Sequence, residues 1–293
     1  MDLSAAGGLA RSQGATPRYM AGMVLLVLAC TGDSSDVRHA RPVLPPEGDA
    51  DTDTDTDTDS DTDTDTDTDT DTDTDTDTTL PGPVYGIDVS HWNGDIDWNA
   101  VAASGITFAI AKASEGDYYT DDAFWGEYDG AADAGLVRGA YHFATPDDSS
   151  GTVQAAYFVN NGGDWIADGR TLPGTLDIEY NPYGDTCYGM SQSEMADWVT
   201  DFNAEYVRLT GRYPLIYTNA NWWNTCVGSD AGADNPLWVA HWGASSPTLP
   251  TGWSTYTFWQ YGAEGVVDGI RGDTDEDLFP GNHSALVRFA DDR

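Results

Sequence analysis

Beyond Pro83, short apolar runs recur between turns rich in Gly, Asp and Asn. Seven of these runs have the length of strands. Several are almost continuously apolar, as expected of strands covered on both faces of a parallel sheet. They cover residues 85–89, 107–112, 137–143, 175–179, 214–218, 237–242 and 256–261. The pattern therefore predicts a mainly parallel sheet with both faces buried.

Helical patterns fall between several of these runs, over residues 121–134, 152–160 and 191–210. The third is the clearest, because Ser191 and Glu194 form a capping-box signature, apolar residues recur on one stripe, and Gly211 follows as a stop. Strands that alternate with helices predict an α/β barrel. Since the later strands are closer together and have fewer helices between them, we expect a single irregular, TIM-like β/α barrel over residues 84–293.

The first 30 residues have the layout of a signal peptide. Arg11 and Arg18 precede an apolar run that is too short to span a bilayer and that ends in Ala29-Cys30. A small residue before a Cys resembles the bacterial lipobox, in which the Cys is lipidated and becomes the new N-terminus. We therefore expect export to a bacterial cell envelope with a lipid anchor on Cys30. The alternative is ordinary cleavage nearby, which leaves Cys30 free and the protein secreted.

Residues 31–83 are predicted to be a disordered, acidic linker. From residue 49 to residue 78 the chain alternates Asp with Thr, except for Ala at position 50 and Ser at position 60. Alternation can indicate a strand, but this segment has no apolar face, and like charges at every second position repel one another. An EF-hand loop also begins with alternating Asp, but it needs a Gly at its sixth position and a Glu at its twelfth. Neither occurs within the tract, so we expect only weak, diffuse cation binding.

The charge balance narrows the set of partners. The chain has 12 Lys and Arg against 50 Asp and Glu, a net charge of −38. Nucleic acid is excluded as a partner, because its binding requires basic residues that displace counterions. An anionic membrane surface would repel the domain, so we expect membrane contact only through the N-terminal lipid. The five His residues are not paired at ligand spacing, so we expect neither a metal nor a cofactor, and we expect a monomer.

Two further cysteines, Cys187 and Cys226, lie in the predicted barrel. If Cys30 carries lipid, they are an even pair in an oxidising compartment, and a disulfide between them is plausible. The alternative is two free, buried thiols.

Carboxylates lie where predicted strands end, which is where α/β barrels carry their catalytic residues. Asp88 ends the first strand, and Asp177 and Glu179 end the fourth. Residues two apart on a strand point to the same face, about 7 Å apart along the chain. Two close carboxylates push one pKa upward, which provides a general acid for a glycosidic oxygen, while neighbouring carboxylates stabilise the oxocarbenium charge. Tyr217, Trp242 and Gln260 lie at or near later strand ends.

From Tyr85 to about Gly281 the chain resembles the glycoside hydrolase family 25 lysozymes of the Chalaropsis type. The matching segments occur in the order of that family across nearly the whole predicted domain. They are YGIDVSHW (85–92), FAIAKASEG (108–116), GAYHF (139–143), LDIE (176–179), IYTN (216–219), LWVAHW (237–242), WQY (259–261) and GIRGDTDEDLF (269–279).

The resemblance implies an irregular β/α barrel without a cofactor. It also implies muramidase activity, which is cleavage of the β-1,4 bond between N-acetylmuramic acid and N-acetylglucosamine in peptidoglycan glycan strands. By position, Glu179 matches the catalytic acid, Asp88 and Asp177 match two other central carboxylates, and Asp275 matches the acidic residue of the closing segment. Positions that line the sugar groove are matched by Tyr141, Tyr217, Trp242 and Gln260.

The closing segment departs from the family pattern. Thr274 and Glu276 stand where an apolar residue is usual, which leaves open whether Asp273, Asp275 or Asp277 points inward. Two rival functions are a non-catalytic glycan-binding module and a surface-display lipoprotein that kept a muramidase-like groove. The presence of all four matched carboxylates argues against loss of turnover.

Overall fold

The computed structural model describes residues 82–292. The predicted signal peptide, Cys30 and the predicted linker up to residue 81 lie outside the described residues. Among the described residues, no helix is both long enough and apolar enough to cross a membrane.

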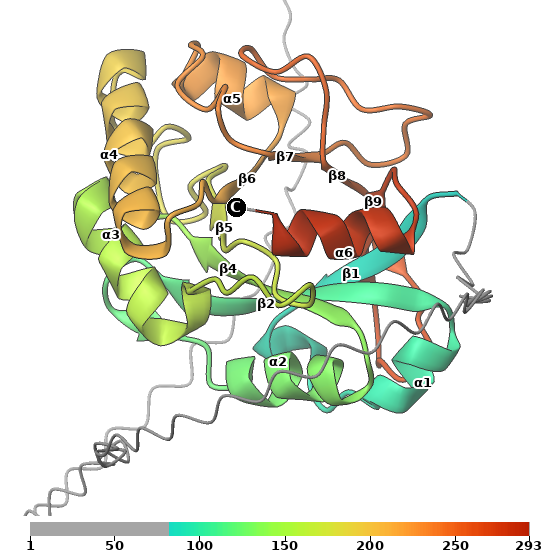
Figure 1. Ribbon diagram of the computed structural model, residues 1–293. Coiled ribbons are helices and arrows are strands. Elements are labelled where there is room, and N and C mark those ends of the chain that lie inside the picture. Colours follow the sequence, from blue (N-terminus) through green and yellow to red (C-terminus); the bar gives the residue numbers. More distant parts are fainter. Residues whose placement is uncertain (1–81, 293) are drawn as a thin grey trace, which may run out of the picture. The chain divides into compact units, whose positions relative to one another are not determined.

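Eight strands form a closed barrel (Figure 1). Seven of them are parallel neighbours and occur in chain order: β1 (Val84–Val89), β2 (Ile106–Glu115), β4 (Val137–Phe143), β5 (Thr175–Asp177), β6 (Leu215–Thr218), β7 (Leu237–Ala240) and β8 (Phe258–Gly265). The eighth, β9 (Thr274–Phe279), is antiparallel to both β8 and β1 and closes the ring between them. The two-residue β3 (Tyr119–Thr120) pairs only with the end of β2. The predicted irregular α/β barrel is confirmed, with one antiparallel strand in it.

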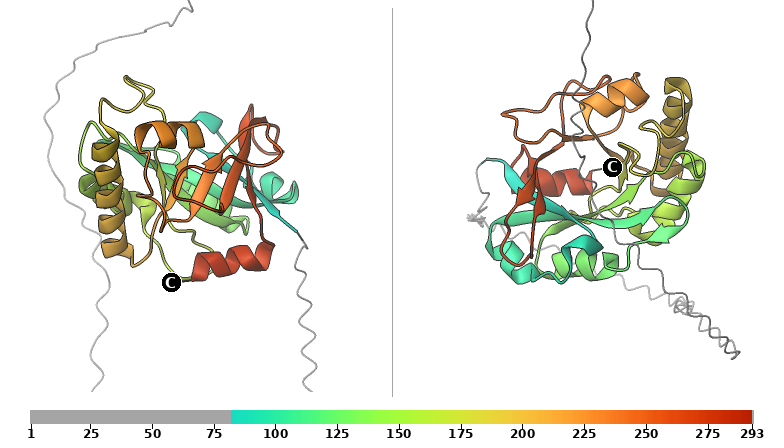
Figure 2. Two further views of the ribbon diagram at one scale, coloured as in Figure 1. Left: turned by 90° about the horizontal axis from the view of Figure 1, so that it is seen from above. Right: turned by 180° about the vertical axis from the view of Figure 1, so that it is seen from behind.

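Helices cover the outside of the barrel and one of its ends (Figure 2). They are η1 (His91–Asn93), α1 (Trp98–Ala103), α2 (Phe124–Asp133), α3 (Gly151–Phe158), η2 (Val159–Gly163), α4 (Gln192–Thr210), α5 (Ala220–Cys226) and α6 (His283–Asp291). The predicted capping box of α4 is present, since Ser191 accepts the backbone N–H of Glu194 and donates its own to the Glu194 carboxylate. Gly211 ends this helix in the left-handed conformation, with φ 78°.

Two apolar layers hold the barrel together. The outer layer lies between the strands and the surrounding helices and includes Leu176, Val199 and Phe202. The inner layer fills the end of the barrel where the parallel strands begin, and α6 packs onto it through Leu286 and Ala290. Because this end is closed by side chains, access to the barrel interior is left at the opposite end, where the parallel strands finish.

A disulfide joins Cys187 to Cys226, with their Cα atoms 5.3 Å apart. Cys187 lies in the segment that follows β5, and Cys226 is the last residue of α5. The bond therefore ties the segment that carries Glu179 to a helix at the same end of the barrel.

Candidate active site

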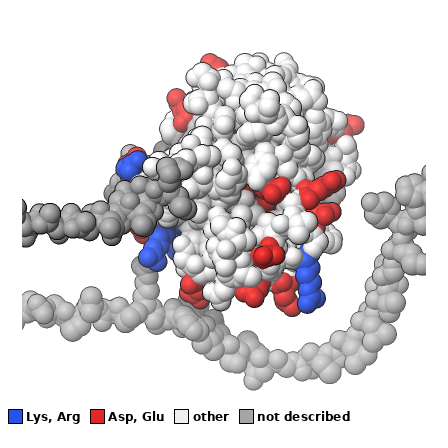
Figure 3. Space-filling model, turned by 90° about the vertical axis from the view of Figure 1, so that its right-hand side faces the viewer, with Lys and Arg blue, Asp and Glu red and all other residues white. Residues whose placement is uncertain are grey.

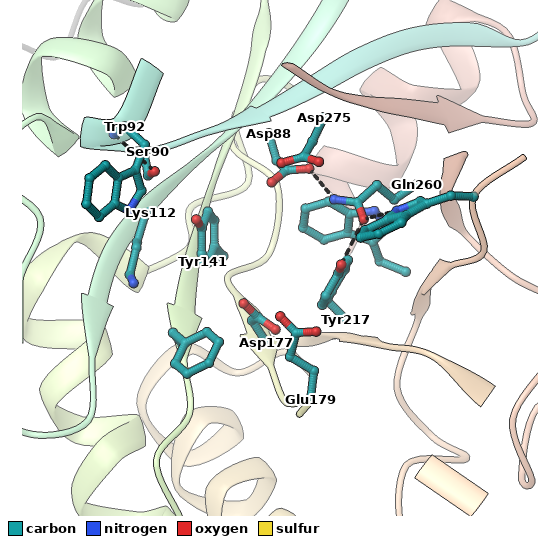
Figure 4. Close-up of a pocket in the computed structure, with 13 residues that line it drawn as sticks. Asp88, Ser90, Trp92, Lys112, Tyr141, Asp177, Glu179, Tyr217, Gln260 and Asp275 are labelled. Carbon is teal, nitrogen blue, oxygen red and sulfur yellow. Dashed lines mark hydrogen bonds between the residues drawn. The ribbon is translucent and has the colours of Figure 1, made fainter. Parts of the chain in front are cut away.

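A cavity of about 320 Å³ opens at the end of the barrel where the parallel strands finish (Figure 4). All eight residues predicted to act in catalysis or in sugar binding line it, together with five others. The full lining is Asp88, Ser90, Trp92, Lys112, Tyr141, Phe143, Asp177, Glu179, Tyr217, Trp238, Trp242, Gln260 and Asp275.

Asp177 and Glu179 lie on one side of this cavity, where their carboxylates approach each other (Figure 4). Asp177 is the last residue of β5, and the backbone N–H of Ile178 bonds to the carbonyl of Tyr217 at 3.0 Å, which holds the chain beyond the strand. Burial, followed by the charge of Glu179, raises the pKa of Asp177 well above its usual value. Burial and the charge of Asp275 raise the pKa of Glu179 to about 7. Glu179 can therefore hold a proton near neutral pH.

A second pair of carboxylates, Asp88 and Asp275, faces the first pair across the cavity (Figure 4). The two residues are directly opposite each other on β1 and β9. Burial and the charges of Asp277 and Asp275 raise the pKa of Asp88, and burial raises the pKa of Asp275 to about 6. Like charges thus oppose full ionisation of the cluster.

The structure answers the question left open by the closing segment. Asp275 and Asp277 are two residues apart on β9; Asp275 lines the cavity, and Asp277 is fully buried beneath it, whereas Asp273 is exposed and lies before the strand. The indole N–H of Trp238 donates to Asp277 Oδ1 at 2.8 Å. Burial raises the pKa of Asp277, so that this side chain adds a fifth acidic group next to Asp88.

Gln260 connects the groove aromatics to the carboxylates. Its side-chain oxygen accepts hydrogen bonds from the Tyr217 hydroxyl and from the Trp242 indole, each at 2.8 Å. Its side-chain nitrogen donates to Asp88 Oδ2 at 2.7 Å. The Trp242 side chain is 58% exposed, so the bond through its indole N–H fixes the ring while the ring faces stay accessible. Gln260 is therefore a positioning residue as well as part of the lining.

The opposite wall carries the one basic residue of the lining, Lys112. Its ammonium group bonds to Glu115 Oε2 at 2.6 Å, and Glu115 Oε1 accepts the hydroxyls of Tyr183 at 2.6 Å and Tyr118 at 3.2 Å. Burial raises the pKa of Glu115, but these hydrogen bonds outweigh burial and lower it overall. The sequence indicated Lys112 as a buried partner for a carboxylate, but it did not identify Glu115 as that carboxylate or the two Tyr hydroxyls that bind it.

His91 bonds through Nδ1 to the carboxylate of the buried Asp121 at 2.6 Å. Within residues 82–292, no group of three or more His, Cys, Asp or Glu side chains has an arrangement that could hold a metal ion.

The model of the family described as "Glycosyl hydrolases family 25" matches residues 87–270. The chain belongs to glycosyl hydrolase family 25. Lysozyme M1 of Streptomyces globisporus is 54% identical over 209 residues, which cover 71% of each chain. The N,O-diacetylmuramidase of Chalaropsis sp. is 42% identical over 183 residues, which cover 60% of this chain and 87% of the relative. The family resemblance inferred from the sequence is confirmed.

Solved structures agree with this assignment. The bacterial lysozyme from Streptomyces coelicolor has a TM-score of 0.70 at 53% identity and covers 71% of this chain and 97% of its own. The muramidase from Acremonium alcalophilum has a TM-score of 0.68 at 46% identity and covers 72% of this chain and 100% of its own. As a family 25 member, the protein is a glycoside hydrolase whose fold is shared across bacterial and fungal lysozymes.

Proposed function

We propose that the protein is a peptidoglycan hydrolase that cleaves the β-1,4 bond between N-acetylmuramic acid and N-acetylglucosamine. The observation that carries the proposal is the ring of four carboxylates around one cavity, in which burial and like charge raise the pKa of Glu179 to about 7. The names of the relatives, lysozyme and N,O-diacetylmuramidase, support the choice of substrate.

In this proposal Glu179 is the general acid that protonates the glycosidic oxygen as the bond breaks. Asp177, two residues earlier on the same face of the chain, orients the 2-acetamido group of the muramic acid, whose carbonyl oxygen bonds to the anomeric carbon as the leaving oxygen departs. Water then attacks this carbon and releases the acetamide oxygen, while the Glu179 carboxylate takes the proton of the water. Asp88 and Asp275 stabilise the positive charge that develops on the sugar ring. The exposed face of Trp242, with Tyr141 and Tyr217, packs against the pyranose rings of the strand.

The proposal extends to the location of the enzyme. Names such as "Autolytic lysozyme" for a relative from Clostridium acetobutylicum support action outside the cytoplasm, at a cell wall. A lipid on Cys30 would hold the enzyme at a membrane, and residues 31–83 would act as a spacer, extended by self-repulsion, that lets the barrel reach the wall. Growth with a labelled fatty acid tests this: label on the protein that is lost in Cys30→Ala supports the anchor, whereas an unlabelled, secreted protein excludes it.

The activity is tested by muropeptide release from purified peptidoglycan. The protein is compared with Glu179→Gln and with Glu264→Gln, which makes the same change at an exposed site outside the cavity. New reducing ends on muramic acid with the protein and with Glu264→Gln, but not with Glu179→Gln, are the expected result. Binding of peptidoglycan without release would favour the rival function, a non-catalytic glycan-binding module.

A further inference from the structure

A second cavity of about 420 Å³ lies at the same end of the barrel as the active site. We call it the amide pocket, and it is lined by Asn219, Ala220, Asn221, Asn224, Thr225, Ala240, His241 and Thr248. These residues belong to α5 and its N-cap, Asn219, which follows β6, and to the end of β7 and the segment after it. The volume is within the range of about 300–1,000 Å³ that is usual for small-molecule sites.

The lining of the amide pocket is linked to the active-site residues in two ways. His241 immediately precedes Trp242, which lines the active site. On the other side, the Asn221 side-chain nitrogen donates to the Tyr180 hydroxyl at 2.7 Å, and Tyr180 is the residue after the proposed acid Glu179. The two linings are thus connected along the chain from His241 to Trp242, and through the hydrogen bond from Asn221 to Tyr180.

The fold fixes the polar side chains of the amide pocket and leaves them with spare donors. Asn219 and Asn224 each accept a backbone N–H at their side-chain oxygen, at 2.9 and 2.8 Å. His241 Nδ1 accepts the backbone N–H of Thr248 at 2.9 Å, which places the ring proton on Nε2. The two Asn NH₂ groups and His241 Nε2 have no partner within residues 82–292. These donors are oriented before any ligand arrives, which lowers the entropic cost of binding.

Formal charge is missing from the lining of the amide pocket. Residues 213–229 and 235–263, which build it, contain no Asp, Glu, Lys or Arg, although 21% of the whole chain is charged. The face drawn in Figure 3 is mostly white in its upper part, with a few acidic side chains at the edges and more gathered in the lower half. The other wall of the active site, in contrast, carries Lys112 and Glu115. A ligand of the amide pocket is therefore expected to be neutral and rich in hydrogen-bonding groups.

We propose that the amide pocket binds a neutral N-acetylhexosamine of the same glycan strand, beyond the sugars held at the bond that is cleaved. This rests on the proposed function. An N-acetylglucosamine unit offers hydroxyl and acetamide oxygens to the three free donors, and the Trp242 ring supports the strand between the two cavities. The stem peptides of peptidoglycan carry carboxylates, and the amide pocket has no cation to pair with them. The amide pocket therefore favours binding of longer glycan strands.

The test uses substitutions that keep the fold contacts of the amide pocket. Asn219→Asp and Asn224→Asp retain the side-chain oxygen that accepts the backbone N–H, but they replace an NH₂ donor by a carboxylate oxygen. Asn99→Asp, on the exposed face of α1, adds one such charge away from both cavities, so each single substitution is also measured against it. KM and kcat are measured on peptide-free glycan strands of four, six and eight sugars for the whole protein, the double variant and the control.

The expected result is that KM falls with strand length for the protein and for Asn99→Asp. In the double variant, KM for the longest strand rises by about tenfold, which corresponds to the loss of two ordinary hydrogen bonds. An unchanged length dependence in the double variant, or a KM that depends on attached stem peptides rather than on strand length, would overturn the proposal.

A failure of the proposed function is distinguishable from a failure of the amide pocket. If the unsubstituted protein hydrolyses no strand, the proposed muramidase activity is refuted. Calorimetric measurement of binding to the same peptide-free strands then decides whether the amide pocket binds a sugar. Weaker binding of the longest strand by the double variant than by Asn99→Asp still supports the pocket, whereas equal binding by both refutes it.

Discussion

Replacing Glu179 by glutamine is expected to stabilise the folded barrel at pH 8 while abolishing its activity. The pKa of Glu179 is raised from 4.5 to about 7 by burial and by the charge of Asp275. Between these two values the folded state keeps a proton that the unfolded chain has lost, so the free energy of unfolding falls as pH rises. Above pH 7 the folded state holds a carboxylate that it solvates poorly, and glutamine removes this cost.

The magnitude follows from the shift. At about 1.4 kcal/mol per pKa unit, a shift of this size corresponds to at most about 3 kcal/mol at pH 8. Because Glu179 is partly exposed and shares its titration with Asp275, we expect about 1–2 kcal/mol. For a domain of this length, this raises the melting temperature by about 2–8 °C. At pH 5 the side chain is protonated in the folded state, and the two proteins should melt within about 1 °C of each other.

Thermal unfolding followed by circular dichroism at pH 5 and pH 8 measures this difference. Glu264→Gln, at an exposed position, controls for the loss of one negative charge from an acidic protein. If Glu179→Gln melts at or below the temperature of the unsubstituted protein at pH 8, Glu179 is not held in a site that disfavours its charge. The argument that makes it the proton donor then fails.

Three further predictions follow from the same geometry. Asp275→Asn removes a charge that raises the pKa of Glu179, so the alkaline limb of residual activity against pH should move down by about half a unit to one unit; an unmoved limb contradicts the coupling. Cys187→Ser with Cys226→Ser opens a bond between residues 39 apart, which should cost about 4 kcal/mol and lower the melting temperature by about 8–16 °C; a chain that melts normally would mean that the bond does not form. Trp242→Phe keeps a ring face but loses the indole N–H, so it should raise KM less than Trp242→Ala; equal effects of the two variants would exclude stacking.

The fold could be predicted from the sequence where buried positions form a periodic or continuous pattern of apolar residues. The helix at residues 192–210 was predictable because its cap, its apolar stripe and its stop are all local signals. The strand β9 was absent from the seven apolar runs, because Asp275 and Asp277 point into the barrel, where a core strand would have apolar residues. The helix α5 was missed because seven residues are too few to show a helical period.

The candidate site was predictable from strand ends and from the family resemblance, but its internal bonds were not. Asp177 and Glu179 are two residues apart in the chain, so the sequence itself shows that their side chains are close. Gln260 and Asp88 are 172 residues apart, and only closure of the barrel brings them within hydrogen-bond distance. The amide pocket was also out of reach: Asn219 directly follows the predicted strand 214–218, but Asn221 and Asn224 come from α5, which the sequence did not show.

The antiparallel strand β9 determines at which stage of folding the active site is complete. It is the last strand in the chain, it contributes Asp275, and it is the only link between β8 and β1 in the ring. A chain that is still being synthesised, or one truncated before residue 274, therefore has an open sheet and lacks the Asp275 carboxylate. Closure of the barrel and assembly of the four carboxylates therefore occur in the same folding step.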